Sequence, residues 1–362
     1  MKILITGFNN EQVHRDYFLR KEIKVLLNHY SLIRCLEDMG HTVEQRPVNI
    51  GEDLSVYDEV ILYIHSIQGF CQRSFDGLWV LQARPDCIVA FDDWQVIDIF
   101  RTIKNYRDDL LEDENRAFRQ YLFDLYQGTT SKEKIVSMKN QFIDACDVAL
   151  AKKNRLLMGV FKGGDLDLFG LEWPKDRVFT YNPNAYNLNR RPENNYGLGG
   201  GFFADEVVRP ENKKEEWIFA SLVQLKTRKW IQDLKIEKWP IQYYGQRRGE
   251  LKDKRVTEPE MCKVYNETWG CLMPAYYHAG SGWWRGRVQQ VADVRSIMVC
   301  DDREGRVYGE AYVGVRPEDV ENMDVSQRAA LAQAQHDCLY DNHPLDKEEQ
   351  KRDIQAILEA SK

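Results

Sequence analysis

Two adjacent aspartates, Asp92 and Asp93, directly follow an apolar run, Asp86 to Phe91, that has the composition of a buried strand. The carboxyl ends of parallel strands deliver functional groups into the ligand crevice of an α/β protein. A partly buried carboxylate in that position can act as a general base. Neighbouring residues of an extended chain point to opposite sides, so we expect one of the two aspartates to enter such a crevice. Paired acids after a strand also occur as helix caps or magnesium ligands, and spacing alone leaves these alternatives open.

The segment from Trp284 to Asp302 has the pattern of a helix that begins on arginines and is followed by a buried strand. Arg287 and Gln290 are three positions apart and therefore project together from the helix. Ile297 to Cys300 is the unbroken apolar run expected of a parallel strand covered on both faces. A cationic helix start near the end of a strand suits a phosphorylated ligand. The alternative is a surface helix with solvated arginines.

A basic segment, Ser221 to Lys229, lies between a predicted strand and a predicted helix. Its positive charges are those of Lys226, Arg228 and Lys229. Cations combined with the backbone N–H groups of a helix start suit a diphosphate. A hydrated basic loop is an equally consistent interpretation of the segment by itself.

A second cationic strand exit begins at Gly245 and includes Arg247 and Arg248. Glycine gives the backbone the freedom that a close approach to a ligand requires. The charged neighbours Lys252 to Arg255 make a hydrated surface loop the competing interpretation.

Predicted strands and helices alternate along the chain, which indicates right-handed βαβ units and parallel sheets. In the first half we expect strands at Lys2–Thr6, His41–Gln45, Tyr57–Ile64, Asp86–Phe91 and Asp147–Ala151, a helix ending near Gly40, and a charged helical stretch from Arg101 to Lys153. In the second half we expect strands at Trp217–Ser221, Ile241–Gly245, Gly270–Pro274 and Ile297–Cys300, and a helical tail from Ser326 to Ala360 with a break at Asn342 to Pro344. The segment Asn182–Gly201 is rich in Asn, Pro and Gly, which predicts a linker and a mobile loop.

The composition is that of an ordinary globular protein, with 362 residues, 30% charged and 43% hydrophobic side chains, and it is long enough for two cores. No apolar run approaches the ~20 residues that cross a bilayer, and the start of the chain lacks the features of a signal peptide. The eight cysteines are scattered without a CxxC pair, which predicts reduced thiols in a cytoplasmic protein and argues against a zinc site. The net charge of −7 argues against wholesale coating of nucleic acid but allows local binding.

Several common active-site motifs are absent from the sequence, namely GxxxxGK[ST], GxGxxG after the first strand, HExxH and GxSxG. Their absence argues against a P-loop kinase, a dinucleotide-dependent oxidoreductase, a zinc hydrolase and a serine hydrolase.

In order and spacing, several segments resemble the phage DNA β-glucosyltransferases of the GT-B fold. These segments are Met1 to Asn10, Glu37 to Gly40, Tyr57–Asp58 with Ser66, Phe91 to Asp93, and Trp284 to Asp302 followed by Gln335 to Asp337. The resemblance covers nearly the whole chain. It implies two Rossmann-like domains facing across a cleft, with residues 1–190 binding the acceptor DNA and residues 191–335 binding the nucleotide sugar. Residues 336–362 would form a C-terminal helix that packs back on the first domain.

Carried over residue by residue, the resemblance implies that Asp93 is the catalytic base, with Asp92 beside it, and that Arg287 contacts the diphosphate of the donor. A glutamate that holds the UDP ribose in the family is replaced here by Gln290, and a sugar-contacting glutamate falls near Asn28. An amide lacks the charge-assisted strength of a carboxylate. These two departures leave glucose and a pentose such as arabinose both open as the transferred sugar.

The family's diphosphate-binding loop falls on Ser221 to Lys229. Its arginines do not align with this chain, so Lys226, Arg228 and Lys229 are the expected substitutes. Gly245 completes the expected UDP-sugar site.

The leading hypothesis is therefore an inverting transfer of a sugar, glucose by default, from a UDP-sugar to 5-hydroxymethylcytosine or another hydroxymethylated pyrimidine in phage duplex DNA. The base would have to leave the duplex stack to react, and the DNA backbone would be held by Arg190, Arg191, Arg247 and Arg248. The alternatives are a GT-B transferase acting on a carbohydrate or a lipid-linked acceptor, and a non-catalytic module that senses a nucleotide. We expect the protein to be a monomer in the cytoplasm of the infected host cell, with no membrane partner. A divalent-metal site is not evident in the sequence, but metal-assisted transfer stays an open alternative.

Overall fold

The computed structural model describes residues 1–6, 30–46, 48–64, 80, 83–91, 155–159, 178–181, 195–196, 201–220, 239–244, 256, 258–273, 286–342 and 346–360. The chain forms two compact units. Unit 1 comprises Met1–Lys24, Cys35–Tyr196 and Lys351–Lys362, and unit 2 comprises Val25–Arg34 and Gly197–Gln350. The last residues of the chain therefore belong to the unit in which the chain begins.

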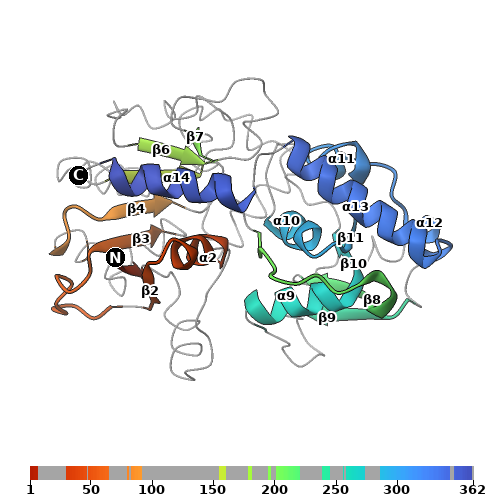
Figure 1. Cartoon of the computed structure of the whole chain (residues 1–362), viewed down its shortest axis with the longest axis horizontal. Coiled ribbons are helices and arrows are strands. Elements are labelled where there is room, and N and C mark those ends of the chain that lie inside the picture. The colour runs from red at the N-terminus through yellow and green to blue at the C-terminus, as the bar shows by residue number, and fades with distance from the viewer. Residues whose placement is uncertain are drawn as a thin grey trace, which may run out of the picture. The chain divides into compact units, whose positions relative to one another are not determined.

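Unit 1 contains a seven-stranded sheet in the order β2-β1-β3-β4-β5-β6-β7, in which all neighbouring strands are parallel (Figure 1). Its strands are β1 (Lys2–Thr6), β2 (Thr42–Gln45), β3 (Glu59–Ile64), β4 (Ile88–Phe91), β5 (Arg155–Gly159), β6 (Val178–Tyr181) and β7 (Asn195–Tyr196). Ile3, Leu4 and Ile5 are fully buried, as expected of a strand that is covered on both faces. The strand order reverses between β1 and β3, so the topological switch point of this sheet lies there.

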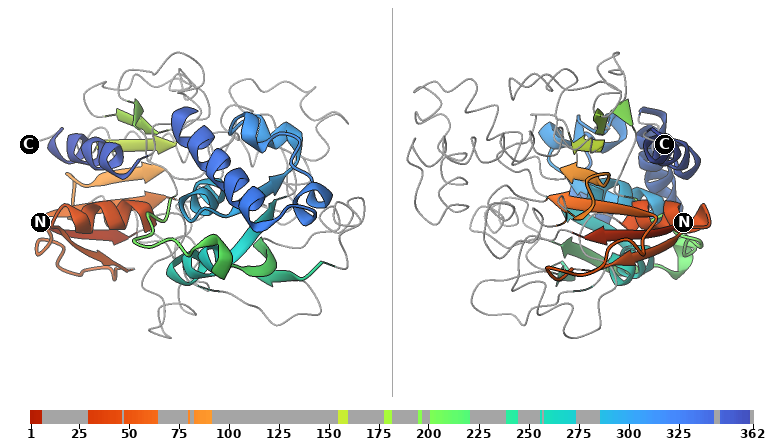
Figure 2. Two further views of the ribbon diagram at one scale, coloured as in Figure 1. Left: turned by 45° about the vertical axis from the view of Figure 1, so that its right-hand side comes forward. Right: turned by 90° about the vertical axis from the view of Figure 1, so that its left-hand side faces the viewer.

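Helices α2 (Tyr30–Asp38) and α14 (Lys347–Glu359) lie side by side against this sheet (Figures 1 and 2). The ammonium of Lys351 is 3.8 Å from a carboxylate oxygen of Asp38, which joins the two helices. α14 is anchored by Ile354, Ile357 and Leu358, all of which are buried. Gly40 has a φ of +82° and follows the end of α2, which is the left-handed conformation that glycine provides at helix ends.

Unit 2 contains a four-stranded parallel sheet in the order β11-β10-β8-β9. Its strands are β8 (Lys214–Ala220), β9 (Ile241–Tyr244), β10 (Thr268–Met273) and β11 (Ile297–Cys300). Every residue of β10 is buried. At Gly270 in this strand a Cβ atom would collide with the ring of Trp217 on β8, so the close packing of the indole requires a glycine.

The helices of unit 2 are α9 (Glu258–Glu267), α10 (Gly286–Asp293), α11 (Asp302–Gly305), α12 (Pro317–Glu321) and α13 (Val325–Asn342), with 3-10 turns η5 (Pro210–Asn212) and η6 (Glu310–Tyr312). Alternate residues of β8 face different cores. Ile218 packs in a cluster with residues of α10 and with Leu339 of α13, whereas Trp217 and Phe219 pack in a second cluster. The sheet is therefore covered on both faces.

The predicted α/β class with two parallel sheets is confirmed, and the predicted strands that fall within the described residues are present to within about three residues at each end. The helical tail is also confirmed, because α13 and α14 flank the predicted break. The segment Asn182–Gly201 differs from its prediction, because Asn195 and Tyr196 pair with β6 as a short edge strand. Arg101 to Lys153, including the predicted strand at Asp147–Ala151, lies outside the described residues.

The helices in the described ranges include none that is both long and apolar enough to cross a membrane.

Candidate functional site

The switch point of the second sheet lies between β8 and β10, where the strand order reverses. These two strands are parallel neighbours, so their carboxyl ends, Ala220 and Met273, lie at the same edge of the sheet. The chain passes from Ala220 directly into the basic segment Ser221 to Lys229, and from Met273 it continues toward α10. The two connections that lead to the predicted phosphate-binding cations therefore start side by side at the position where open α/β sheets bind ligands.

Helix α10 carries Arg287 near its first turn. The apolar residues Val288, Val291 and Ala292 of this helix are at most 1% exposed, and the helix packs against α9, α13 and β11. The predicted helix and the strand that follows it are confirmed. Because its apolar stripe is fixed in the core, α10 holds the backbone of Arg287 in one place.

The guanidinium of Arg287 is hydrogen bonded to the phenol of Tyr265 on α9. Tyr265 is 1% exposed. Burial raises the pKa of this phenol well above its usual range, although the positive charge of Arg287 opposes the shift. The tyrosine is therefore neutral at physiological pH, and sequence analysis did not identify it because α9 was not predicted.

Gln290 lies one helical turn after Arg287 and is 7% exposed. Its neighbour Gln289 is completely buried, and its amide nitrogen is 3.4 Å from the hydroxyl of Tyr340. The second half of α10 thus places two amides inside unit 2. Contact between Gln290 and a ribose stays a prediction.

Asp293, the last residue of α10, binds the segment near the point where the chain re-enters unit 2 at Gly197. Its Oδ2 atom accepts hydrogen bonds from the backbone N–H groups of Phe202, at 2.7 Å, and Phe203, at 3.2 Å. Its Oδ1 atom accepts a hydrogen bond from the hydroxyl of Tyr340. Burial raises the pKa of Asp293 to about 6, although the bonds from Tyr340 and the two amides oppose the shift.

The role of Asp293 was not predicted from the sequence, although the sequence contains one signal for it. A negative charge at the C-terminus of a helix is unfavourable, because that end carries the negative pole of the helix dipole. Asp293 occupies the last position of α10. A carboxylate at such a position indicates specific donors elsewhere in the fold, and here two backbone amides and a tyrosine provide them.

Lys213 supports the opposite edge of the same sheet. Its ammonium donates to the backbone oxygens of Asn266, at 2.8 Å, and Val294, at 3.1 Å, and to the hydroxyl of Ser296, at 2.9 Å. The two carbonyls lie at the C-terminal ends of α9 and α10, where a cation is favourable. Lys213 therefore fixes the two helices that carry Tyr265 and Arg287 relative to each other.

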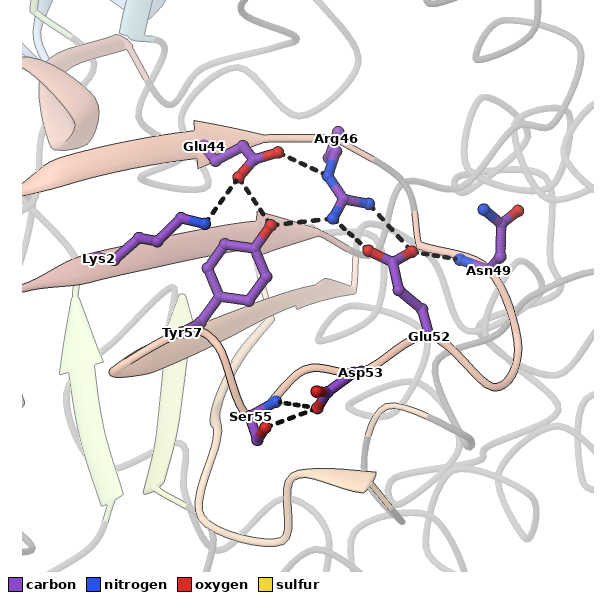
Figure 3. Close-up of polar contacts among 8 residues, drawn as sticks. All are labelled: Lys2, Glu44, Arg46, Asn49, Glu52, Asp53, Ser55 and Tyr57. Atoms are coloured by element: carbon purple, nitrogen blue, oxygen red, sulfur yellow. Dashed lines mark hydrogen bonds and ion pairs between the residues drawn. The ribbon is translucent and has the colours of Figure 1, made fainter.

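A polar network in unit 1 joins the end of β2 to the connection before β3 (Figure 3). Arg46 donates to Glu44 at 2.8 Å, to the hydroxyl of Tyr57 at 2.9 Å, and to both carboxylate oxygens of Glu52. The Tyr57 hydroxyl donates to Glu44 at 2.7 Å, and the ammonium of Lys2 is 4.5 Å from the centre of the Tyr57 ring. The polar groups named here bond to one another. We therefore interpret this network as a structural feature that stabilises the connection between β2 and β3.

Most of the predicted site lies outside the described residues. This applies to the catalytic pair Asp92 and Asp93, to Asn28, Ser221, Lys226, Arg228, Lys229 and Gly245 of the nucleotide site, and to Arg190, Arg191, Arg247 and Arg248 of the DNA site. The structure does place the strand that leads to the aspartates. β4 is an inner strand that pairs with β3 and β5 and ends at Phe91, the residue before Asp92 in the sequence.

Within the described part of the chain, no three His, Cys, Asp or Glu side chains gather in a way that could hold a metal ion. The described cysteines, Cys35, Cys87, Cys262, Cys271, Cys300 and Cys338, are free thiols.

No family model matches the chain, and no curated protein matches its sequence. Solved structures do match. T4 phage BGT in complex with its UDP-glucose substrate has a TM-score of 0.50 at 14% identity, covering 99% of both chains. T4 phage BGT in complex with UDP and Mn²⁺ has a TM-score of 0.48 at 15% identity, again covering 99% of both chains. An alpha-glucosyltransferase in complex with UDP-glucose and DNA containing an abasic site has a TM-score of 0.45 at 10% identity, covering 99% of this chain and 100% of that one.

The first of these likenesses extends over nearly the full length of both proteins. In this chain the fold consists of two parallel sheets with helices packed against them. The chain therefore has the α/β fold of T4 phage BGT, a beta-glucosyltransferase.

Proposed function

We propose that the protein is a DNA glycosyltransferase that moves a sugar from a UDP-sugar to a hydroxymethylated pyrimidine, 5-hydroxymethylcytosine by default, in duplex DNA. The observation that supports this most strongly is that the chain leaves β8 and β10 side by side at the switch point, from β8 into the basic segment Ser221 to Lys229 and from β10 toward Arg287 of α10. A diphosphate carries the charge that such a site would bind. T4 phage BGT, whose fold the chain shares, binds UDP-glucose.

In the proposed reaction Asp93 removes the proton from the hydroxymethyl group of the base while that oxygen attacks the anomeric carbon of the sugar. A new C–O bond forms, and the bond between the sugar and the diphosphate breaks with its electron pair moving to UDP. Arg287, Lys226, Arg228 and Lys229 stabilise the negative charge that develops on the diphosphate. Attack from the face opposite the leaving group inverts the anomeric centre.

The remaining residues of the proposed donor site determine how the nucleoside and the sugar are held. Gln290 would contact the ribose of UDP, and Asn28 would contact the transferred sugar. Ser221 and Gly245 complete the proposed UDP-sugar site. UDP-glucose is the default donor because T4 phage BGT binds it. The amides at positions 290 and 28 lack the charge-assisted hydrogen bonds of a carboxylate, so a UDP-pentose such as UDP-arabinose is the second candidate.

The proposed acceptor is a base that has left the duplex stack, as required of enzymes that act on a base inside a duplex. Arg190, Arg191, Arg247 and Arg248 would bind the phosphates on either side without reading sequence. We propose that the enzyme acts as a monomer in the cytoplasm of an infected host cell. A divalent ion could assist the departure of UDP.

A donor and acceptor screen tests the proposal. Duplexes that contain 5-hydroxymethylcytosine, 5-hydroxymethyluracil or unmodified cytosine are incubated with UDP-glucose or UDP-arabinose, with and without Mg²⁺ or Mn²⁺, and are analysed by nucleoside mass spectrometry. We expect a hexose added to 5-hydroxymethylcytosine, and Asp93→Ala serves as the inactive control. Absence of transfer and of UDP-sugar hydrolysis in every combination would rule out the enzyme and favour a nucleotide sensor. Transfer to a glycan but never to DNA would favour a carbohydrate acceptor.

A further inference from the structure

Tyr265 is held rigidly inside unit 2. It is 1% exposed, and its ring packs against that of Phe202 with 6.1 Å between ring centres. Its backbone carbonyl accepts a hydrogen bond from the Ser296 hydroxyl at 2.7 Å. The same hydroxyl accepts a hydrogen bond from the Lys213 ammonium. Both the ring and the backbone of this tyrosine are therefore fixed by neighbours from other elements.

The phenol of Tyr265 has two polar neighbours, the Arg287 guanidinium and the thiol of Cys271. A guanidinium can only donate, so Arg287 donates to the phenol oxygen. The phenol hydrogen is then available to the sulfur of Cys271, which is fully buried on the inner strand β10. Cys271 on β10, Tyr265 on α9 and Arg287 on α10 therefore form consecutive contacts.

The chemical nature of this contact matters for binding an anion. A carboxylate partner would orient an arginine but would also neutralise much of its charge. The phenol of Tyr265 is neutral, so this bond orients the guanidinium and leaves the positive charge in place. An oriented cation loses less side-chain entropy when an anion binds.

We infer that Tyr265 is a positioning residue, which holds the Arg287 guanidinium in the orientation that meets the diphosphate of the nucleotide donor. The inference rests on the proposed role of Arg287 in donor binding. The expected gain from fixing one long side chain corresponds to roughly 2- to 12-fold in UDP affinity. The contribution of Arg287 itself, a charge-assisted hydrogen bond, corresponds to roughly 10- to 150-fold.

The experiment measures UDP and uridine binding by calorimetry for the wild type and for three variants of the full-length protein. The variants are Tyr265→Phe, Arg287→Ala and the combination of both. Tyr265→Phe removes only the hydroxyl, so UDP binding should weaken roughly 2- to 12-fold, while uridine, which has no phosphate, should bind unchanged. In the Arg287→Ala background the same substitution should have no further effect. Tyr312→Phe is the matched control, because it removes another buried hydroxyl of unit 2, one that donates to the backbone oxygen of Gln335 at 3.0 Å, and it should leave UDP affinity unchanged.

Two outcomes separate this inference from the proposed function. If Arg287→Ala weakens UDP binding and Tyr265→Phe does not, or if Tyr265→Phe weakens it equally in both backgrounds, the positioning role is wrong and the proposed function stands. If Arg287→Ala leaves UDP affinity unchanged, both the positioning role and the C-terminal half of the proposed donor site are wrong. Cys271→Ala provides a second route should Tyr265→Phe fold poorly. It removes the acceptor of the phenol hydrogen, and it should weaken UDP binding only while Arg287 is present.

Discussion

At the scale of single residues, the proposed chemistry depends on which of two adjacent carboxylates reaches the acceptor. We expect Asp93→Ala to reduce transfer by a factor of at least ~100, the usual contribution of a general base. UDP-sugar binding should be retained, because the base contacts the acceptor oxygen and not the nucleotide. The measurements are transfer by mass spectrometry and binding by calorimetry. Asp92→Ala is the matched control, and normal transfer by Asp93→Ala together with loss of transfer by Asp92→Ala would assign the role to Asp92.

Lys213 gives a second prediction at this scale. We expect Lys213→Met to lower the free energy of unfolding, at roughly 1–3 kcal/mol for each buried acceptor left without a donor. Burial lowers the pKa of Lys213 to about 8 from 10.5. Between these two pH values the unfolded chain binds more protons than the folded protein, so the wild type should gain stability relative to the variant as pH rises from about 8 to about 10.5.

Urea unfolding of wild type and Lys213→Met at pH 7, 8.5 and 10 measures this difference. A constant difference across the three pH values would show that the ammonium titrates normally in the folded protein. A variant as stable as the wild type at pH 7 would show that the carbonyls at the ends of α9 and α10 find other donors.

At the scale of elements, helix α10 is attached at both ends, through Arg287 to α9 and through Asp293 to the segment that contains Phe202 and Phe203. We expect Asp293→Asn to loosen that segment, because the amide of asparagine presents N–H groups to the backbone N–H groups of Phe202 and Phe203. Hydrogen exchange at residues 202 and 203 should accelerate. Tyr340→Phe is the matched control, since it removes one donor to Asp293 and leaves the backbone bonds in place, and it should have a smaller effect.

The pH dependence of this attachment has a definite sign. The pKa of Asp293 is raised from 3.8 to about 6 in the folded protein. The stability that comes from proton binding is therefore fully present below pH 3.8 and is lost as pH rises through about 6. The stability of the wild type relative to Asp293→Asn should fall over this interval by up to ~3 kcal/mol, as measured by urea unfolding at pH 4, 5, 6 and 7. If the stability of the wild type relative to Asp293→Asn instead increased with pH, the three hydrogen-bond donors would lower the pKa of Asp293 more than burial raises it.

At the scale of the whole molecule, the net charge is −7, so the proposed binding of DNA requires a local group of cations. Replacing both Arg190 and Arg191 by alanine should weaken duplex binding to a similar degree for all sequences. It should also flatten the dependence of log affinity on log salt by about two units. UDP affinity should be unchanged. An unchanged salt slope would place the DNA contact elsewhere, and the equivalent double variant at Arg247 and Arg248 would then be measured.

Much of the architecture could be predicted from the sequence because its signals are local. Continuous apolar runs such as Ile3 to Ile5 and Ile297 to Cys300 predict strands covered on both faces, and these residues are buried. The helix predicted within Trp284 to Asp302 is α10, in which Val288 and Val291 are fully buried. The asparagine, proline and glycine around Asn195 and Tyr196 predict a linker, whereas pairing with β6 makes these two residues an edge strand. Tertiary context overrode composition at that position.

Local sequence patterns were sufficient to predict the fold class, the helix that carries Arg287 and the strand that leads to Asp92 and Asp93. The contact of Arg287 with a buried phenol and the contacts of Asp293 with Phe202 and Tyr340 depend on tertiary packing. Asp293 is separated from Tyr340 by 47 residues and from Phe202 by 91. Side-chain periodicity records which face of an element is buried, but it contains no information about which distant donor will face a given carboxylate. Those pairings arise when β8, β10 and β11 assemble into one sheet and bring the ends of α9, α10 and α13 together.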